Sequence, residues 1–213
     1  GASDMRNRAE NQIKLVMRRH GATPSNKEHR YLGRTDEGLS MEGEQALQEV
    51  RNAYPSIDYL FSSPMRRCTQ TARILYPKQE IFVIPEWMEM DFGDFEGKNY
   101  VELKDNEYYQ KWIDSNGTLP FPNGESREDF TERCKQGFYK MLSQLNSLHL
   151  INRTVKVGLV IHGGTIMSLL STFCGGEYFD YQVVNSHGYI CTLNEMQGYP
   201  QIVDVQKIGQ DRL

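Results

Sequence analysis

The sequence has no large excess of either charge, no long hydrophobic run and no closely spaced cysteine pair. Lysine and arginine number 24 against 28 aspartates and glutamates, so the net charge of −4 gives no reason to expect a nucleic acid or membrane partner. No apolar run approaches the length of a membrane span or of a signal-peptide core. The four cysteines, which are widely spaced, are Cys68, Cys134, Cys174 and Cys191. This spacing argues against a zinc site or a disulfide framework and favours reduced thiols in a cytoplasmic protein.

The length of 213 residues suits one domain with a sizeable core. The segment Gly1 to Met5 is typical of a cloning remnant or a disordered lead, with Met5 as a candidate native start. We therefore expect residues 1–12 to precede a single domain formed by residues 13–213.

Two apolar segments each end in a histidine that is followed by glycine. Residues 13–17 lead to Arg19 and His20, and residues 154–161 lead to His162. One histidine after a strand is usually an ordinary loop or core residue, but here the pattern recurs. The carboxyl ends of strands in an open α/β sheet are where ligands bind. Two histidines beside an arginine at that edge indicate a phosphate site.

Strand-like and helix-like segments alternate along the rest of the chain. This alternation predicts a three-layer α/β/α sandwich with a mostly parallel sheet and a cap region inserted. We expect further strands at residues 58–61 and 81–84, an edge pair of antiparallel strands at 189–193 and 202–207, and helices at 41–53, from 66 onward, at 100–113, 126–148 and 165–173. Ser40 and Ser126 are expected to cap two of these helices.

Arg66 and Arg67 follow Ser63-Pro64, a helix-start signature, and so fall in the first turn of a helix. Cations there oppose the helix dipole. A solvated basic turn explains one of the two arginines. The other is expected to face an anion held against the start of the helix.

Residues 86–97 form an acidic and aromatic loop that contains Glu89. Most acidic loops are merely solvated. Here the neighbouring apolar side chains can desolvate Glu89 and raise its pKa, as a general acid requires. The stretch of residues 90–125 has no clear strand and is predicted to form a cap over the site.

Taken in order, these motifs resemble the histidine phosphatase superfamily, whose fold is phosphoglycerate-mutase-like. Arg19-His20-Gly21 resembles the family signature, and residues 62–72 resemble its second block, which makes Arg67 rather than Arg66 the phosphate arginine. By the same resemblance Glu89 is the acid and His162 the second histidine. The residues that this implies for phosphate binding are Arg19, Thr23, Asn26, Arg67 and Gly163.

Within the superfamily, residues 89–97 and Gly124-Glu125-Ser126 are most similar to the alpha-ribazole phosphatase branch, which acts in cobalamin biosynthesis. The sequence departs from the usual pattern at Arg18, Ala22, Phe95 and Met167. At Met167 the branch often has arginine, so a contact that orients the substrate is expected to be missing.

The resemblance implies a metal-independent phosphomonoesterase that acts on a small-molecule phosphate ester. His20, which the neighbouring arginines would keep neutral near pH 7, would attack phosphorus and form a phosphohistidine. Glu89 would protonate the leaving alkoxide and then activate water. The arginines would supply the positive charge, with a further hydrogen bond from His162. No cofactor or metal is expected, since the sequence shows no carboxylate cluster suited to magnesium.

Three other functions compete with this interpretation. A phosphoglycerate mutase would return the phosphoryl group to a second oxygen, although mutases are longer than this chain. A broad-specificity sugar or acid phosphatase shares the same motifs. A regulatory phosphoester-binding module, which is not an enzyme, would lack the nucleophile or the acid, whereas His20 and Glu89 are both present. The sequence does not indicate an oligomeric state.

Overall fold

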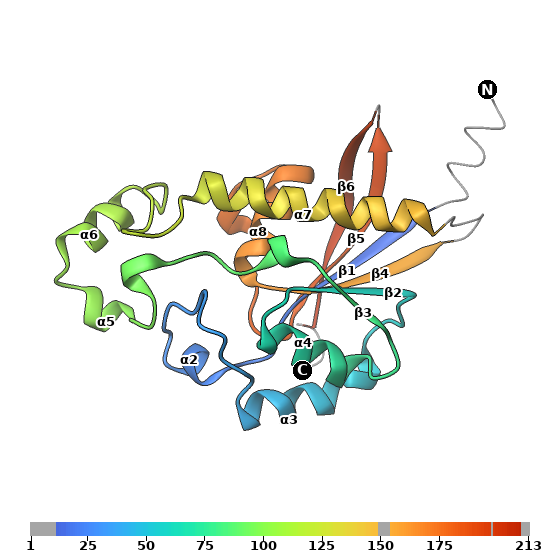
Figure 1. Ribbon diagram of the computed structural model, residues 1–213, viewed down its shortest axis with the longest axis horizontal. Helices are drawn as coiled ribbons and strands as arrows, with labels where there is room; N and C mark the ends of the chain where they lie inside the picture. The colour runs from blue at the N-terminus through green and yellow to red at the C-terminus, as the bar shows by residue number, and fades with distance from the viewer. Residues whose placement is uncertain (1–11, 149–153, 197, 210–213) are drawn as a thin grey trace.

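The computed structural model describes residues 12–148, 154–196 and 198–209 (Figure 1). The expected lead therefore lies outside the described residues, except for Gln12. The carbonyl oxygen of Gln12 accepts a hydrogen bond from the Val155 N–H at 2.8 Å, so strand pairing begins one residue before the expected domain boundary. Within the described ranges, no helix is long and apolar enough to cross a membrane.

A six-stranded mixed sheet forms the middle layer, in the order β3-β2-β4-β1-β5-β6. Its strands are β1 (Ile13–Arg19), β2 (Tyr59–Ser62), β3 (Ile81–Val83), β4 (Val155–Ile161), β5 (Gly188–Met196) and β6 (Tyr199–Ile208). The pairs β1–β4, β2–β4 and β2–β3 are parallel. Strand β5 is antiparallel to both of its neighbours, β1 and β6. The mostly parallel sheet with an antiparallel pair at one edge confirms the fold prediction.

Helices cover both faces of this sheet. In Figure 1, α7 (Arg127–Ser147) and α8 (Gly163–Phe173) lie on one side of the strands, and α3 (Met41–Val50) and α4 (Arg66–Leu75) lie on the other. The remaining short helices outside the cap are α2 (Pro24–Lys27), η1 (Arg51–Ala53) and η4 (Tyr178–Tyr181).

The central strand β1 joins the two cores because its side chains alternate between the faces of the sheet. Leu15 and Met17 belong to the larger core, together with Phe138 of α7. Val16, between them, belongs to the smaller core with Cys68 of α4. All these side chains are buried, which holds the carboxyl end of β1 in a fixed position.

The predicted cap region, residues 90–125, contains only short helices: η3 (Gly93–Phe95), α5 (Tyr100–Leu103) and α6 (Glu107–Asp114), with η2 (Pro85–Trp87) just before it. The helix expected over residues 100–113 is thus wrong as a single element. It is broken because the Asn106 side chain accepts a hydrogen bond from the Tyr109 N–H and starts a second helix. Aromatic rings hold the region together, for example Phe92 against Phe121 at a centroid distance of 4.9 Å.

Candidate active site

The two histidines meet because β1 and β4 are paired in register. Arg19 lies opposite Ile161, the last pair of the ladder, and the next residue on each strand is a histidine. The N–H of His20 donates to the Ile161 carbonyl at 3.1 Å, and the ring centroids of His20 and His162 lie 5.3 Å apart. The sheet therefore brings together the two histidines that the sequence singled out.

The hydrogen bond of His20 defines its tautomer. Its Nδ1 atom lies 2.7 Å from the Gly21 carbonyl oxygen, which can only accept, so Nδ1 carries the proton. Nε2 makes no hydrogen bond to any described residue and keeps a free lone pair. Burial, together with the charges of Arg19 and Arg67, holds the pKa of His20 well below its usual value. The imidazole is thus neutral and nucleophilic at neutral pH.

Two arginines present unpaired donors at this site. Arg19 donates from Nη1 to the Val183 carbonyl at 2.8 Å, and Arg67 donates to the carbonyls of Thr35 and Gly33 at 2.9 and 2.8 Å. The Nε atoms of Arg19 and Arg67 are buried without a partner among the described residues. An oxyanion of phosphate size would satisfy such donors. Burial also lowers the pKa of Arg19.

His162 is fully buried beside a serine that sequence reasoning did not assign to the site. Its Nε2 lies 2.7 Å from the Ser63 hydroxyl, which also accepts a hydrogen bond from the Met65 N–H at 3.2 Å. Burial, and next the charge of Arg67, holds the pKa of His162 well below its usual value. Ser63 was expected to help start the helix, but the N-cap of α4 is Met65, without a side-chain bond. The Ser63 hydroxyl instead orients the ring of His162.

Glu89, the predicted general acid, is buried beside the cavity. Its Oε1 accepts a hydrogen bond from the Met90 N–H at 2.8 Å, and only 9% of the residue is exposed. Burial raises the pKa of Glu89, although the Met90 bond and the charges of Arg67 and Arg19 oppose that shift. Gly164 leaves room for the Glu89 side chain, since a Cβ at position 164 would lie 2.7 Å from Glu89 Oε1.

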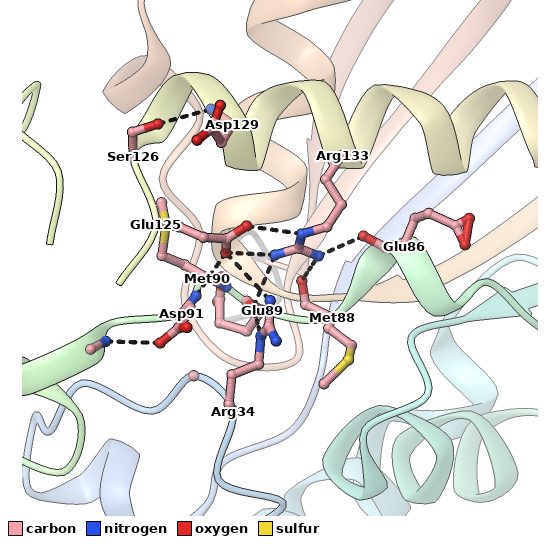
Figure 2. A network of polar contacts seen from close by, with 12 residues as sticks. Arg34, Glu86, Met88, Glu89, Met90, Asp91, Glu125, Ser126, Asp129 and Arg133 are labelled. Carbon is pink, nitrogen blue, oxygen red and sulfur yellow. Dashed lines mark hydrogen bonds and ion pairs between the residues drawn. The ribbon is translucent and has the colours of Figure 1, made fainter. Parts of the chain in front are cut away.

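An ion pair at the start of α7 anchors the backbone around Glu89 (Figure 2). Arg133 forms two hydrogen bonds to Glu125, at 2.8 and 3.0 Å, and donates to the carbonyl oxygens of Glu86, Met88 and Glu89. Although burial opposes it, the Arg133 contact lowers the pKa of Glu125. This network was missed at the sequence level because its members lie up to 47 residues apart.

Thr23 and Asn26, expected to contact phosphate, are engaged with each other at the start of α2. The Thr23 hydroxyl accepts from the Asn26 N–H at 3.2 Å, and Asn26 Oδ1 accepts from the Thr23 N–H at 3.1 Å. Asn185, which was not predicted, donates to Asn26 Oδ1 and to the carbonyls of His20 and Gly21. These bonds brace the loop after β1, and phosphate contact by Thr23 and Asn26 stays a prediction.

A cavity of about 480 Å³ opens beside this cluster. Arg19, Glu89 and Gly163 are among the residues that line it, whereas His20, Arg67 and His162 are buried and do not line it. Met167 is part of its wall, so the departure from the expected arginine changes the chemistry of the cavity itself.

Comparison with known proteins agrees with this geometry. A family model described as the histidine phosphatase superfamily, branch 1, matches residues 15–207. The chain belongs to that superfamily. It is thereby a phosphoric monoester hydrolase, as are its relatives that carry phosphatase names.

Three relatives show how varied the names within this histidine phosphatase family are. The adenosylcobalamin/alpha-ribazole phosphatase of Escherichia coli is 29% identical over 76% of this chain and 80% of its own length. A protein of Enterobacter sp. with a phosphoglycerate mutase name is 31% identical over 77% of this chain and 75% of its own. A solved phosphoserine phosphatase mutant of Entamoeba histolytica, in complex with phosphoserine, is 25% identical, with a TM-score of 0.73 over 91% of this chain and 96% of its own.

In this histidine phosphatase the two neighbouring arginines, Arg66 and Arg67, have different environments. Arg67 is fully buried at the site, whereas Arg66 is exposed and its guanidinium makes no hydrogen bond to a described residue. The backbone N–H of Arg66 donates to Asp36, and its carbonyl accepts from the Thr69 hydroxyl. Arg67→Ala is expected to lower kcat/KM by at least about 2 kcal/mol in barrier terms, because a charge-assisted contact is lost. Arg66→Ala should be nearly silent. Thermal unfolding of both variants distinguishes a loss of catalysis from a loss of folding. Equal catalytic losses in the two variants would contradict the assignment of Arg67 as the phosphate arginine.

Proposed function

We propose that this protein is a metal-independent phosphomonoesterase that hydrolyses a small-molecule phosphate ester through a phosphohistidine at His20. The observation that carries the proposal is the free Nε2 of His20, beside two buried guanidinium groups with unpaired Nε atoms. A neutral nucleophile next to fixed positive charge suits attack on a phosphate anion.

In the first step, Nε2 of His20 attacks phosphorus in line and forms the P–N bond as the ester P–O bond breaks. Glu89 gives its proton to the departing oxygen, so the alcohol leaves neutral. In the second step, the Glu89 carboxylate takes a proton from water, the water oxygen attacks phosphorus, and the P–N bond breaks. Inorganic phosphate leaves and His20 is restored.

The remaining residues stabilise charge on the phosphoryl oxygens. Arg19 and Arg67 would donate from their Nε atoms, and His162 would donate from a ring nitrogen set by Ser63. Thr23, Asn26 and the N–H of Gly163 at the start of α8 would complete the set. Gly163 lines the cavity beside Arg19, which supports this role.

The substrate is proposed at the level of class, with alpha-ribazole 5'-phosphate as one candidate on the strength of the motifs at residues 89–97 and of the named relative. A phosphate-release screen tests it, with alpha-ribazole phosphate, 3-phosphoglycerate, phosphoserine, sugar phosphates and an aryl phosphate side by side. Release from alpha-ribazole phosphate far above the others supports that candidate. Conversion of 3-phosphoglycerate to its isomer without phosphate release would favour the mutase alternative instead.

Activity is expected to survive exhaustive chelation and to be blocked by vanadate. The two guanidinium groups supply the charge that a metal ion supplies in other phosphatases, and vanadate mimics five-coordinate phosphorus. Phosphate release is measured before and after treatment with a chelator, with and without vanadate. Strict dependence on added magnesium or zinc would contradict the mechanism.

A further inference from the structure

The wall of the cavity carries a guanidinium group that the mechanism does not use. Arg127, the first residue of α7, lines the cavity and donates from Nη2 to the Asn116 carbonyl at 2.9 Å. Its Cζ lies 4.5 Å above the ring of Tyr178 and 4.8 Å above that of Phe179. The turn after α6 and helix η4 therefore both hold this side chain in place.

Arg127 has no carboxylate partner among the described residues, so its charge is not neutralised within that part of the chain. Arg19 and Glu89 are the other charged residues in the cavity wall. Arg19 directly precedes His20 in the sequence, and Glu89 is the proposed acid. Tyr178 also lines the cavity: burial raises its pKa, the Glu89 carboxylate adds to the rise, and Arg127 opposes it. The cavity wall thus carries the proposed acid, Tyr178 and a cation without a carboxylate partner among the described residues.

A glycine is needed for this arrangement. Gly117 has a φ of +71°, and a Cβ there would lie 2.8 Å from Arg127 Nη2 and 3.2 Å from the Trp112 ring. With a side chain at this position, Trp112 and Arg127 could not both approach as they do. The local backbone keeps the guanidinium next to an aromatic wall.

Apart from Gln182, the rest of the cavity is lined mainly by apolar and aromatic residues. Phe92, Phe121 and Trp112 form one wall, with centroid distances of 4.9 Å from Phe92 to Phe121 and 5.0 Å from Trp112 to Phe121. A volume of about 480 Å³ is within the range of pockets that hold drug-sized ligands. A two- or three-carbon leaving group would leave most of it unfilled, whereas a flat ring would contact these walls.

We propose that the preferred substrates are flat-ring phosphate monoesters that carry a carboxylate at the end remote from the phosphate, and that Arg127 binds this carboxylate. Alpha-ribazole 5'-phosphate, which carries no carboxylate, is then not a preferred substrate. The inference rests on the proposed function, because it places the phosphate at His20. It makes Arg127 a specificity residue and not part of the chemistry. The planar fork of a guanidinium matches a carboxylate, and the surrounding aromatic rings lower the local dielectric constant.

The test compares matched substrates that differ only in the carboxylate: phenyl against 4-carboxyphenyl phosphate, and 2-naphthyl against 6-carboxy-2-naphthyl phosphate. In the wild type, kcat/KM is expected to be about tenfold higher for the carboxylated member of at least one pair. Arg127→Gln should abolish that preference and leave the uncarboxylated member within about twofold. Arg127→Lys, which keeps the charge but not the fork, should retain part of it.

Arg73→Gln is the matched control, since it removes one positive charge from an exposed position of α4 that does not line the cavity. It should leave the preference intact. The inference is overturned if the wild type shows no preference in either pair, or if Arg127→Gln lowers both members of a pair equally. Either result, with phenyl phosphate still hydrolysed, leaves the proposed function standing. If no phosphate is released from any of the four esters, the proposed function fails together with the inference.

Discussion

Substitution of His20 by alanine is expected to abolish turnover, lowering kcat by at least about 10⁴-fold, because the attacking atom is removed. The Arg19, Arg67 and His162 side chains would remain and would still bind phosphate. Steady-state phosphate release, together with the affinity for inorganic phosphate, separates lost chemistry from lost binding. Appreciable activity in the variant would show that His20 is not the nucleophile.

The stability of this variant needs its own measurement. The position of His20 in a loop suggests little packing, but the residue is only 3% exposed and its ring packs against that of His162. Alanine therefore leaves a small cavity, and a loss of stability of about 1–3 kcal/mol is expected. His20→Gln, closer in volume, should be equally inactive and more stable. Restored activity in the glutamine variant would count against the proposed role.

Substitution of Glu89 by glutamine is expected to slow alkyl phosphates by roughly 10²–10⁴-fold, the usual contribution of a positioned acid or base. Formation of the phosphoenzyme from nitrophenyl phosphate should suffer much less, because nitrophenolate leaves without a proton. The comparison requires the pre-steady-state burst, since the same carboxylate is also needed to activate water. A burst slowed equally with both substrates would remove Glu89 from the acid role.

The other acids of this loop are engaged elsewhere, which supplies a control. Asp91 accepts from the Gly93 N–H, Asp94 pairs with Asn123, and Glu96 accepts from the Gly33 N–H. None of the three lines the cavity, whereas Glu89 does. Asp94→Asn, at an exposed position, should leave both rates unchanged.

The two pKa shifts also predict the pH profile for an alkyl phosphate. The acid step needs protonated Glu89, whose pKa is raised, so kcat/KM should fall as pH increases through that value. The attack needs neutral His20, whose pKa is lowered, so the rate should fall only in acid well below the usual histidine range. Glu89→Gln should lose the basic limb and keep the acidic one. If Glu89→Gln lost the acidic limb instead, the acidic limb would belong to Glu89 and not to His20.

The fold and the meeting of the two histidines could be predicted from sequence because both follow from local patterns. Apolar runs mark the strands β1 and β4, and a residue directly after a strand must lie at the carboxyl edge of the sheet. The caps at Ser40 and Ser126 are also local, and both are present in the structure. Arg67 was separated from Arg66 by family resemblance, and the structure buries it while exposing its neighbour.

The contacts that hold the site together could not be predicted, because they join distant segments. Ser63 meets His162 across 99 residues, and Asn185 meets the loop of His20 across 165. Nothing in the local sequence of Arg127 indicates that it shares a cavity with Glu89. The break between α5 and α6 was missed because Asn106 has a preference for capping that competes with helix continuity.

The most direct test of the mechanism is to find where the phosphoryl group goes. The wild-type enzyme is mixed rapidly with substrate carrying labelled phosphate, quenched in alkali within the burst, digested, and the labelled peptide is sequenced by mass spectrometry. We expect one phosphate per active site on His20, stable in base and lost in acid. Label on any other residue, or a burst of alcohol release with no labelled protein, would contradict the phosphohistidine mechanism.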